Sequence, residues 1–399
     1  MLTNTITTYG AVTKFFHWSI AVLIIAMIPL GIYANDLPYD TGAALADKAW
    51  FFSLHKTIGV AIFFLALARI AWAISQPRPA LLNADKPAEA GLATLAHWLL
   101  YISLVIVPAS GWIHHAATTG FAPIWWPLPQ DLPLVPKDDA VAHTFKSLHI
   151  IFERVLAVTL ILHVAGALKH HIIDRDLTLR RMLPGIAPYI DLPSERAHPK
   201  WPLAGALGVF AIALSIGAAL GAFSHKADTP AVPTLAAVES GWSVQDGTLG
   251  LTVRQFGSDV TGSFQDWTAA INFSEQLGAD GTHGDVEVTV AIASLTLGSV
   301  TAQAMGADFF AAETHPTAIF TADILPDGDT YTANGTLTIK GISSPVNLPF
   351  SLQIDGDTAT MQGQTRLNRT SFNIGEAYPD ESSLGFDVAL EVALTATRN

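Results

Sequence analysis

The hydrophobic pattern of the chain changes near residue 225, from long apolar runs to short alternating segments. Before that point five stretches are long and apolar enough, or nearly so, to cross a bilayer, which takes ~20 helical residues. These stretches are residues 15–34, 51–74, 91–113, 147–168 and 201–223. The pattern therefore predicts a membrane part made of five helices, the first four forming a bundle.

Beyond a Pro- and Ala-rich linker, expected over residues 228–240, the pattern is typical of strands. Asp285–Val290 places three valines on one face, and Phe386–Val392 alternates in the same way. Turn residues such as Pro326–Asp329 separate segments of this kind. The second half is thus predicted to be an antiparallel sandwich or closed barrel. One helix is expected within it, from Thr301 to about Glu313.

Composition supports this division. Half of the 399 residues are apolar and 14% are charged, against ~25% charged in soluble domains. Residues 1–226 hold 16 basic against 13 acidic side chains (+3), and the remainder holds 5 against 21 (−16). The acidic half argues against nucleic acid as a partner, because phosphate contacts need Lys and Arg. The absence of cysteine excludes disulfides, iron–sulfur clusters and covalently attached haem.

The basic residues that flank the apolar runs predict the orientation. With the N-terminus inside, ten of them lie on the cytoplasmic side and five outside, as the positive-inside rule favours. Five spans then place everything after residue 223 outside, which in a bacterium is the periplasm. The run 201–223 also resembles a retained signal peptide, but its length favours an uncleaved anchor in the inner membrane.

Four histidines form the candidate site, since ionisable residues inside a membrane are costly and usually functional. They are His17, His55, His149 and His163. His149 and His163 are 14 residues apart, which on a helix returns to within about 40° of the same face, ~21 Å further along. Because successive spans alternate in direction, His17 is expected to face His163, and His55 to face His149.

Two facing imidazoles in an apolar bundle are the ligands that low-spin haem iron takes. Zinc is a weaker alternative, because its ligands converge on one point and His149 lies far from His163. For any one of the four, a hydrogen bond between helices remains an alternative. Gly59 and Gly166 either let a macrocycle approach the backbone or serve helix packing.

Other polar residues near the spans have weaker interpretations. His97 is expected to pack rather than to ligate iron. His114–His115 and His170–His171 lie at span ends, where we expect them to face solvent or lipid headgroups. Arg154 needs a partner within the membrane, and either Glu153 or a haem propionate would serve.

Residues 9–185 resemble the prokaryotic cytochrome b561 family. The resemblance is carried by the segments around the histidines, which are residues 16–18, 54–59, 147–149 and 162–171, and by residues 176–184. It implies a cytochrome with two b-type haems that exchanges electrons with the quinone pool. Some members of the family oxidise superoxide outside and reduce ubiquinone. The outer loops have few lysines and several aspartates, which does not indicate an electrostatic funnel for an anion.

Residues 241–397 resemble the YceI family of lipocalin-like periplasmic proteins. Thr336–Val346, Leu367–Gly375 and Met305–Phe310 carry this resemblance, whereas the sequence near Gly247–Leu249 departs from the family pattern. The resemblance implies a barrel around an apolar cavity for a polyisoprenoid, such as a quinone tail. Eight strands leave room for one ligand or for a filling of side chains, and the sequence alone does not separate these two.

The sequence thus predicts an electron-transfer protein with two haem b groups and a tethered barrel that holds ubiquinone or another isoprenoid. An unknown periplasmic electron donor or acceptor completes the expected partners. Two alternatives are a superoxide:quinone oxidoreductase, and an isoprenoid carrier whose haem bundle is a redox anchor. No catalytic triad, phosphate loop or nucleotide fingerprint is found at a credible spacing.

Overall fold

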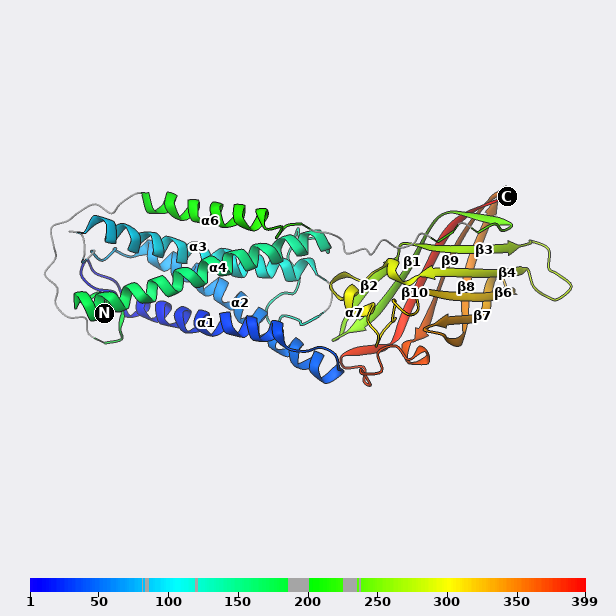
Figure 1. Ribbon diagram of the computed structural model, residues 1–399, viewed down its shortest axis with the longest axis horizontal. Helices are drawn as coiled ribbons and strands as arrows, with labels where there is room; N and C mark the ends of the chain where they lie inside the picture. Colours follow the sequence, from blue (N-terminus) through cyan, green and yellow to red (C-terminus); the bar gives the residue numbers. More distant parts are fainter. Residues whose placement is uncertain (81, 83–85, 119–120, 186–200, 225–234, 237) are drawn as a thin grey trace. The chain divides into compact units, whose positions relative to one another are not determined.

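The computed structural model describes residues 1–80, 82, 86–118, 121–185, 201–224, 235–236 and 238–399 (Figure 1). These residues form two compact units, one of long helices and one that contains the whole β-sheet. Most of the expected linker, residues 228–234 and 237, lies outside the described residues.

The helical unit contains the five expected long helices. They are α1 (Ala11–Asp36), α2 (Gly42–Ser75), α3 (Pro87–Ala117), α4 (Asp139–Lys169) and α6 (Trp201–Ala219). Each is long and apolar enough to cross a membrane, which confirms the prediction from the hydrophobic runs and indicates a multi-pass membrane protein. Each helix extends beyond its apolar run on at least one side except α6, which ends four residues before the run does.

Local signals explain where α4 begins and ends. The Asp138 side chain caps its first turn by accepting a hydrogen bond from the Val141 amide at 2.8 Å. At the other end the helix passes into a π-helical turn, η1 (His170–Asp174), which stops at Arg175 in the left-handed conformation (φ 53°). A short helix, α5 (Thr178–Met182), follows. Large apolar side chains such as Ile20, Leu104 and Leu156 pack together between the helices.

The second unit is built from antiparallel strands. In chain order they are β1 (Trp242–Gln255), β2 (Ser258–Phe264), β3 (Trp267–Phe273), β4 (Gly284–Ala291), β5 (Leu295–Thr296), β6 (Thr317–Asp327), β7 (Thr330–Ile339), β8 (Ile342–Asp355), β9 (Thr358–Asn368) and β10 (Leu384–Arg398). Eight of them form a ring in the order β10-β9-β8-β7-β6-β4-β3-β1, and β1 pairs with β10 to close it. The predicted closed barrel is therefore confirmed.

Alternation along the strands decides what faces the barrel interior. Val286, Val288 and Val290 of β4 line the interior, as do alternate residues of β10 from Val388 onward. Gly328, at φ 60°, makes the turn between β6 and β7. The alternation of period two predicted both strands, and the turn residues Pro326–Asp329 predicted this turn.

The long helix expected from Thr301 to Glu313 is not formed. Only Thr301–Ala304 is helical (α7), after which the chain makes successive turns. Ala311 adopts a positive φ of 48°, and its amide bonds to the Gly306 carbonyl. These turns bring Phe309 and Phe310 to the barrel interior. Packing at the barrel end thus overrides the helical propensity of the segment.

Candidate functional site

The structure brings the four predicted histidines together as two facing pairs. His17 on α1 faces His163 on α4, and their ring centroids are 6.3 Å apart. His55 on α2 faces His149 on α4 at the same separation of 6.3 Å. Each pair joins two helices, and both pairs share α4.

The ring of His149 is held by a hydrogen bond that it donates to a backbone carbonyl of the facing helix α3. Its Nδ1 lies 2.8 Å from the Val107 carbonyl oxygen. Because a carbonyl oxygen can only accept, Nδ1 carries the proton and Nε2 keeps its lone pair. The bond between His149 and the Val107 carbonyl fixes the tautomer and the orientation that a metal-ligating histidine needs.

Two glycines make room for the His55–His149 pair. A Cβ added at Gly31 of α1 would lie 2.8 Å from Cε1 of His55, and one at Gly111 of α3 would lie 2.9 Å from Nδ1 of His149. Sequence reasoning missed both. It singled out Gly59 and Gly166 instead. A Cβ added at Gly59 would lie 3.9 Å from Met27, and one at Gly166 would have nothing within 4 Å; a role for these two beside a macrocycle stays a prediction.

The side chain of Arg69, on α2, lies near the His17–His163 pair. It is close enough to both rings to interact with them electrostatically, and its guanidinium stacks over Tyr101 at 5.2 Å. The sequence did carry a signal for it. Arg69 follows His55 by 14 residues, the same interval that separates His149 from His163, so it shares a face with His55 at the level of the other pair.

Arg154 and His97 have different surroundings. The Arg154 side chain is 68% exposed and forms an ion pair with Glu153 at 3.5 Å, so its predicted propionate contact stays a prediction. His97 on α3 packs edge-on against His163, with ring centroids 5.2 Å apart.

The expectation that His114 and His115 face solvent or headgroups is wrong. His115 is 5% exposed, and its Nε2 lies 2.9 Å from the Gln130 side-chain oxygen. Its Nδ1 lies 3.2 Å from the Lys56 ammonium. His114 bonds through Nδ1 to the Ala142 carbonyl at 2.8 Å. The reason is that α3 continues to residue 117, where a loop residue, Gln130, reaches back to its last turns.

His170 is also buried, contrary to expectation. Its Nδ1 forms a hydrogen bond with the Asp176 carboxylate at 2.6 Å. The carboxylates of Glu89 and Asp174 each lie 3.3 Å from its ring nitrogens. Glu89, His170 and Asp174 could together hold a metal ion, but the Lys169 ammonium forms an ion pair with each of the two carboxylates at 2.7 Å and so competes with a cation for them. Although burial raises the pKa of Asp176, hydrogen bonds from Thr178 and His170 outweigh it and lower the pKa.

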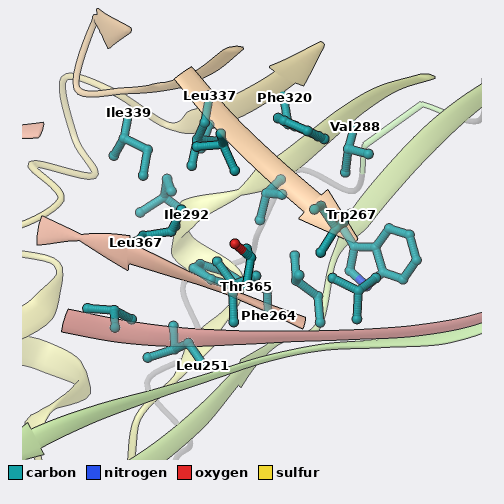
Figure 2. Close-up of a pocket in the computed structure, with 18 of the residues that line it drawn as sticks. Leu251, Phe264, Trp267, Val288, Ile292, Phe320, Leu337, Ile339, Thr365 and Leu367 are labelled. Carbon is teal, nitrogen blue, oxygen red and sulfur yellow. The ribbon is translucent and has the colours of Figure 1, made fainter. Parts of the chain in front are cut away.

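The barrel encloses an apolar cavity of about 290 Å³ (Figure 2). Leu251, Trp267, Val288 and Phe320 are among the side chains that surround it in Figure 2. The barrel interior is therefore not filled by side chains. The cavity volume is many times the ~10–15 Å³ that one water requires. Polar side chains reach it at few points, chiefly Gln255, Gln303, Thr365, Arg369 and Tyr378.

Arg369 organises one end of this barrel. It is 3% exposed, and its guanidinium donates to the carbonyl oxygens of Ile374, Gly375, Tyr378, Leu384 and Gly385 at 2.6–3.1 Å. Burial lowers the pKa of Arg369. Burial also raises the pKa of Tyr378. The hydrogen bond from Gln303 lowers this pKa but offsets only part of the rise.

Comparisons with known proteins match the two units separately. Residues 8–185 match the family model "Prokaryotic cytochrome b561". Over 189 residues, 45% of this chain and 94% of the relative, the sequence is 31% identical to cytochrome b561 homolog 2 of Escherichia coli (strain K12). The chain belongs to the prokaryotic cytochrome b561 family. It is also 26% identical over 177 residues, 44% of this chain and 96% of the relative, to the probable superoxide oxidase CybB of Yersinia pestis.

This cytochrome b561 carries a second module. Residues 242–396 match the model "YceI-like domain". The solved structure of BcnA from Burkholderia cenocepacia is 30% identical and covers 38% of this chain and 96% of its own, with a TM-score of 0.35. The two family models confirm both resemblances stated from the sequence.

The residues of the helical unit fit the b-type haem that the family implies. A metal–nitrogen bond of ~2.1 Å on each side puts two facing imidazole centroids roughly 6 Å apart, close to the 6.3 Å of both pairs. Among the described residues, the one group of three or more metal-ligating side chains lies elsewhere, at Glu89. His97 lies beside His163, but it does not form with the pair a group of three ligands close enough to share one ion. Each pair thus suits a haem iron better than tetrahedral zinc.

Proposed function

We propose that this cytochrome b561 carries two haem b groups and transfers electrons between the quinone pool and a second partner. The observation that carries the proposal is the presence of two facing histidine pairs on one bundle. His17 and His163 would hold one haem, and His55 and His149 the other. The interval of 14 residues puts His149 and His163 ~21 Å apart along α4, so one helix would serve both groups.

The protein's own side chains would orient the haem ligands and keep water away from the haem groups. When bound, each haem supplies a one-electron carrier. The Val107 carbonyl keeps the proton of His149 on Nδ1 and so leaves Nε2 to the iron. Gly31 and Gly111 leave room for the rings of the His55–His149 pair. Apolar side chains between the helices, such as Ile24 and Leu104, exclude water.

The orientation is proposed from charge. The positive-inside rule assigns Lys14, Arg175, Arg180 and Arg181 to the cytoplasm, and with them the His17 end of α1. Arg196 and Lys200, which were counted as cytoplasmic, and Lys226, which was counted as periplasmic, are not among the described residues. The His55–His149 pair and the barrel are then on the periplasmic side of a bacterial inner membrane.

The barrel's part in this function is to hold an isoprenoid, such as the tail of ubiquinone, near the membrane surface. The support is the apolar cavity, whose volume of about 290 Å³ lies just below the ~300–1,000 Å³ usual for ligand sites. A covalent tether raises the effective concentration of a ligand-loaded module to roughly the mM range. That is a physical reason for joining a lipid-binding barrel to a quinone-linked cytochrome.

Superoxide oxidation is a second candidate, favoured by the 26% identity to the probable superoxide oxidase of Yersinia pestis. The two candidates share the haem groups and differ in the donor. Haem reduction by superoxide in the absence of quinol, abolished by superoxide dismutase, would identify this second function.

The test of the leading proposal is anaerobic mixing of the oxidised full chain with a short-chain ubiquinol. We expect the α-band of reduced b-type haem to appear after the quinol is added. It should disappear again when the matching quinone is added in excess. A haem spectrum that stays oxidised at saturating quinol would contradict quinone exchange.

A further inference from the structure

The polar side chains of the barrel cavity gather at one end. Gln255 is the last residue of β1, and it pairs in register with Leu384, the first residue of β10. Gln303, in α7, donates from Nε2 to the Tyr378 hydroxyl at 2.9 Å. Arg369 donates to the carbonyls of both Tyr378 and Leu384, which brings it to the same end. The rest of the lining is apolar apart from Thr365, so the cavity has the polarity of a lipid with a small head group.

The one cation in this lining is unavailable to a ligand. A guanidinium has five N–H donors, and Arg369 makes five hydrogen bonds, all to backbone carbonyls. It is the only charged residue among the described side chains that line the cavity. A phosphate in the cavity would therefore find no free Arg or Lys donor, which is the usual means of binding one.

The charges around Arg369 also disfavour an anion. Asp308, Asp380 and Glu381 all interact electrostatically with its guanidinium, so three acidic groups surround one basic group. A phosphate brought to this end would be repelled as well as stripped of its water. Prenyl phosphates and diphosphates are thus poorly matched to the site.

Gln255 has an unmet hydrogen bond. The residue is 5% exposed and lines the cavity, and its buried side-chain oxygen has no hydrogen-bond partner. An unsatisfied buried polar atom is costly, and a ligand group that bonds to it recovers that cost. A hydroxyl can donate a hydrogen bond to this oxygen, whereas an ether oxygen can only accept one.

We propose that the cavity takes an uncharged prenyl lipid whose head group carries a hydroxyl bonded to Gln255, and that it rejects prenyl phosphates. Prenyl alcohols and prenylhydroquinones share this chemistry. The inference rests on the proposed function in one respect, namely that the barrel binds an isoprenoid at all. It adds which head group the barrel selects and the residue that selects it.

The experiment compares three ligands with one C20 chain: geranylgeraniol, its methyl ether and its monophosphate. Each competes with tritiated geranylgeraniol for the full chain in detergent, after correction for partition into protein-free micelles. We expect the alcohol to bind about tenfold more tightly than the ether, the effect of one recovered buried hydrogen bond. The phosphate should bind more weakly still.

Two variants locate the effect. Gln255→Leu should lower the affinity for the alcohol to that for the ether and leave the ether unchanged. Gln364→Leu, on the exposed face of β9, is the matched control and should leave the ratio as in the wild type. If Gln255→Leu does not fold, the three wild-type affinities still decide the matter.

The outcomes separate the two levels of the proposal. Equal affinity for alcohol and ether, or a phosphate that binds as tightly as the alcohol, overturns the head-group inference. Failure of all three ligands to bind instead overturns the isoprenoid role of the barrel. A final arm, with the haem kept reduced by dithionite, adds a prenylhydroquinone as competitor. Displacement of the label assigns the site to reduced quinones as well as alcohols, and its absence restricts the site to prenyl alcohols.

Discussion

At the scale of single residues, sequence reasoning found the histidines but not what supports them. The four histidines were identifiable because a polar residue in an apolar run is conspicuous and because helical spacing predicts which of them meet. Gly31 and Gly111 could not be found in this way. Their role depends on which side chain of another helix points at them, and helix rotation is not encoded in an apolar run with little periodicity.

The first prediction concerns these two glycines. Gly31→Ala and Gly111→Ala should each displace a ring of the His55–His149 pair, because the new Cβ would lie within 2.9 Å of that ring. Loss of such supporting geometry typically costs 10–100-fold in metal affinity. We expect titration with haem to show weakened binding of one haem per chain and unchanged binding of the other.

The control for this prediction is Gly208→Ala on α6, where nothing lies within 4 Å of the added Cβ. It should bind both haems like the wild type. Equal haem binding in Gly111→Ala and Gly208→Ala would show that the space left by Gly111 beside His149 is not needed for haem binding.

The second residue-scale prediction concerns Arg369. Lysine keeps the charge but offers three donors where Arg369 uses five. Arg369→Lys should therefore lower the free energy of unfolding of the barrel by about 2–4 kcal/mol, since several buried carbonyls lose their partners. Urea unfolding followed by tryptophan fluorescence measures it, and Arg366→Lys, a neighbour on β9, is the control expected to change little.

At the scale of elements, prediction succeeded where one periodicity dominates and failed where contacts decide. The alternation in β4 and β10 predicted both strands and their inward faces. The segment after Thr301 was expected to be one helix, yet only four residues are helical, because Phe309 and Phe310 are drawn into the barrel interior. The burial of His115 was likewise missed, since it depends on Gln130 in a loop.

The inward face of β4 yields the third prediction. Val288→Phe adds a ring to the side chain that points into the cavity (Figure 2), and so should reduce the ligand volume. We expect prenyl-lipid binding to fall at least about tenfold, because overpacking of a filled site costs ~1–3 kcal/mol. Glu287→Phe, one residue earlier on the exposed face, should leave binding intact; a loss in both variants would point to misfolding rather than cavity filling.

At the scale of the whole molecule, the sequence predicted two parts from the change of hydrophobic pattern and from the uneven charge, and the structure divides into two units. The number of long helices and the closed barrel followed from the same pattern. The resemblance to the YceI family implied a cavity, but the residue pattern alone could not predict it, because inward apolar residues look alike whether they meet or leave a space. Its discovery is what makes a lipid-binding role for the barrel concrete.

The fourth prediction tests why the two parts are joined. Removal of residues 229–399 should slow haem reduction by a long-chain ubiquinol, which partitions poorly into water, because the tethered barrel no longer supplies it at raised concentration. Reduction by a short-chain ubiquinol should be much less affected. Stopped-flow spectra of the full chain and of the shortened chain measure the two rates of haem reduction. Identical rates with the long-chain quinol would refute the proposal that the barrel supplies quinol to the haem unit.

The measurement that tests the central claim most directly is a reduced-minus-oxidised spectrum with haem quantified per polypeptide, on the wild type and on four single His→Ala variants. The account predicts two b-type haems in the wild type and one in each variant. His17→Ala and His163→Ala should lose the same haem, and His55→Ala and His149→Ala the other. A wild type without haem, or haem loss only when other histidines are changed, would contradict the paired histidines as the site of electron transfer.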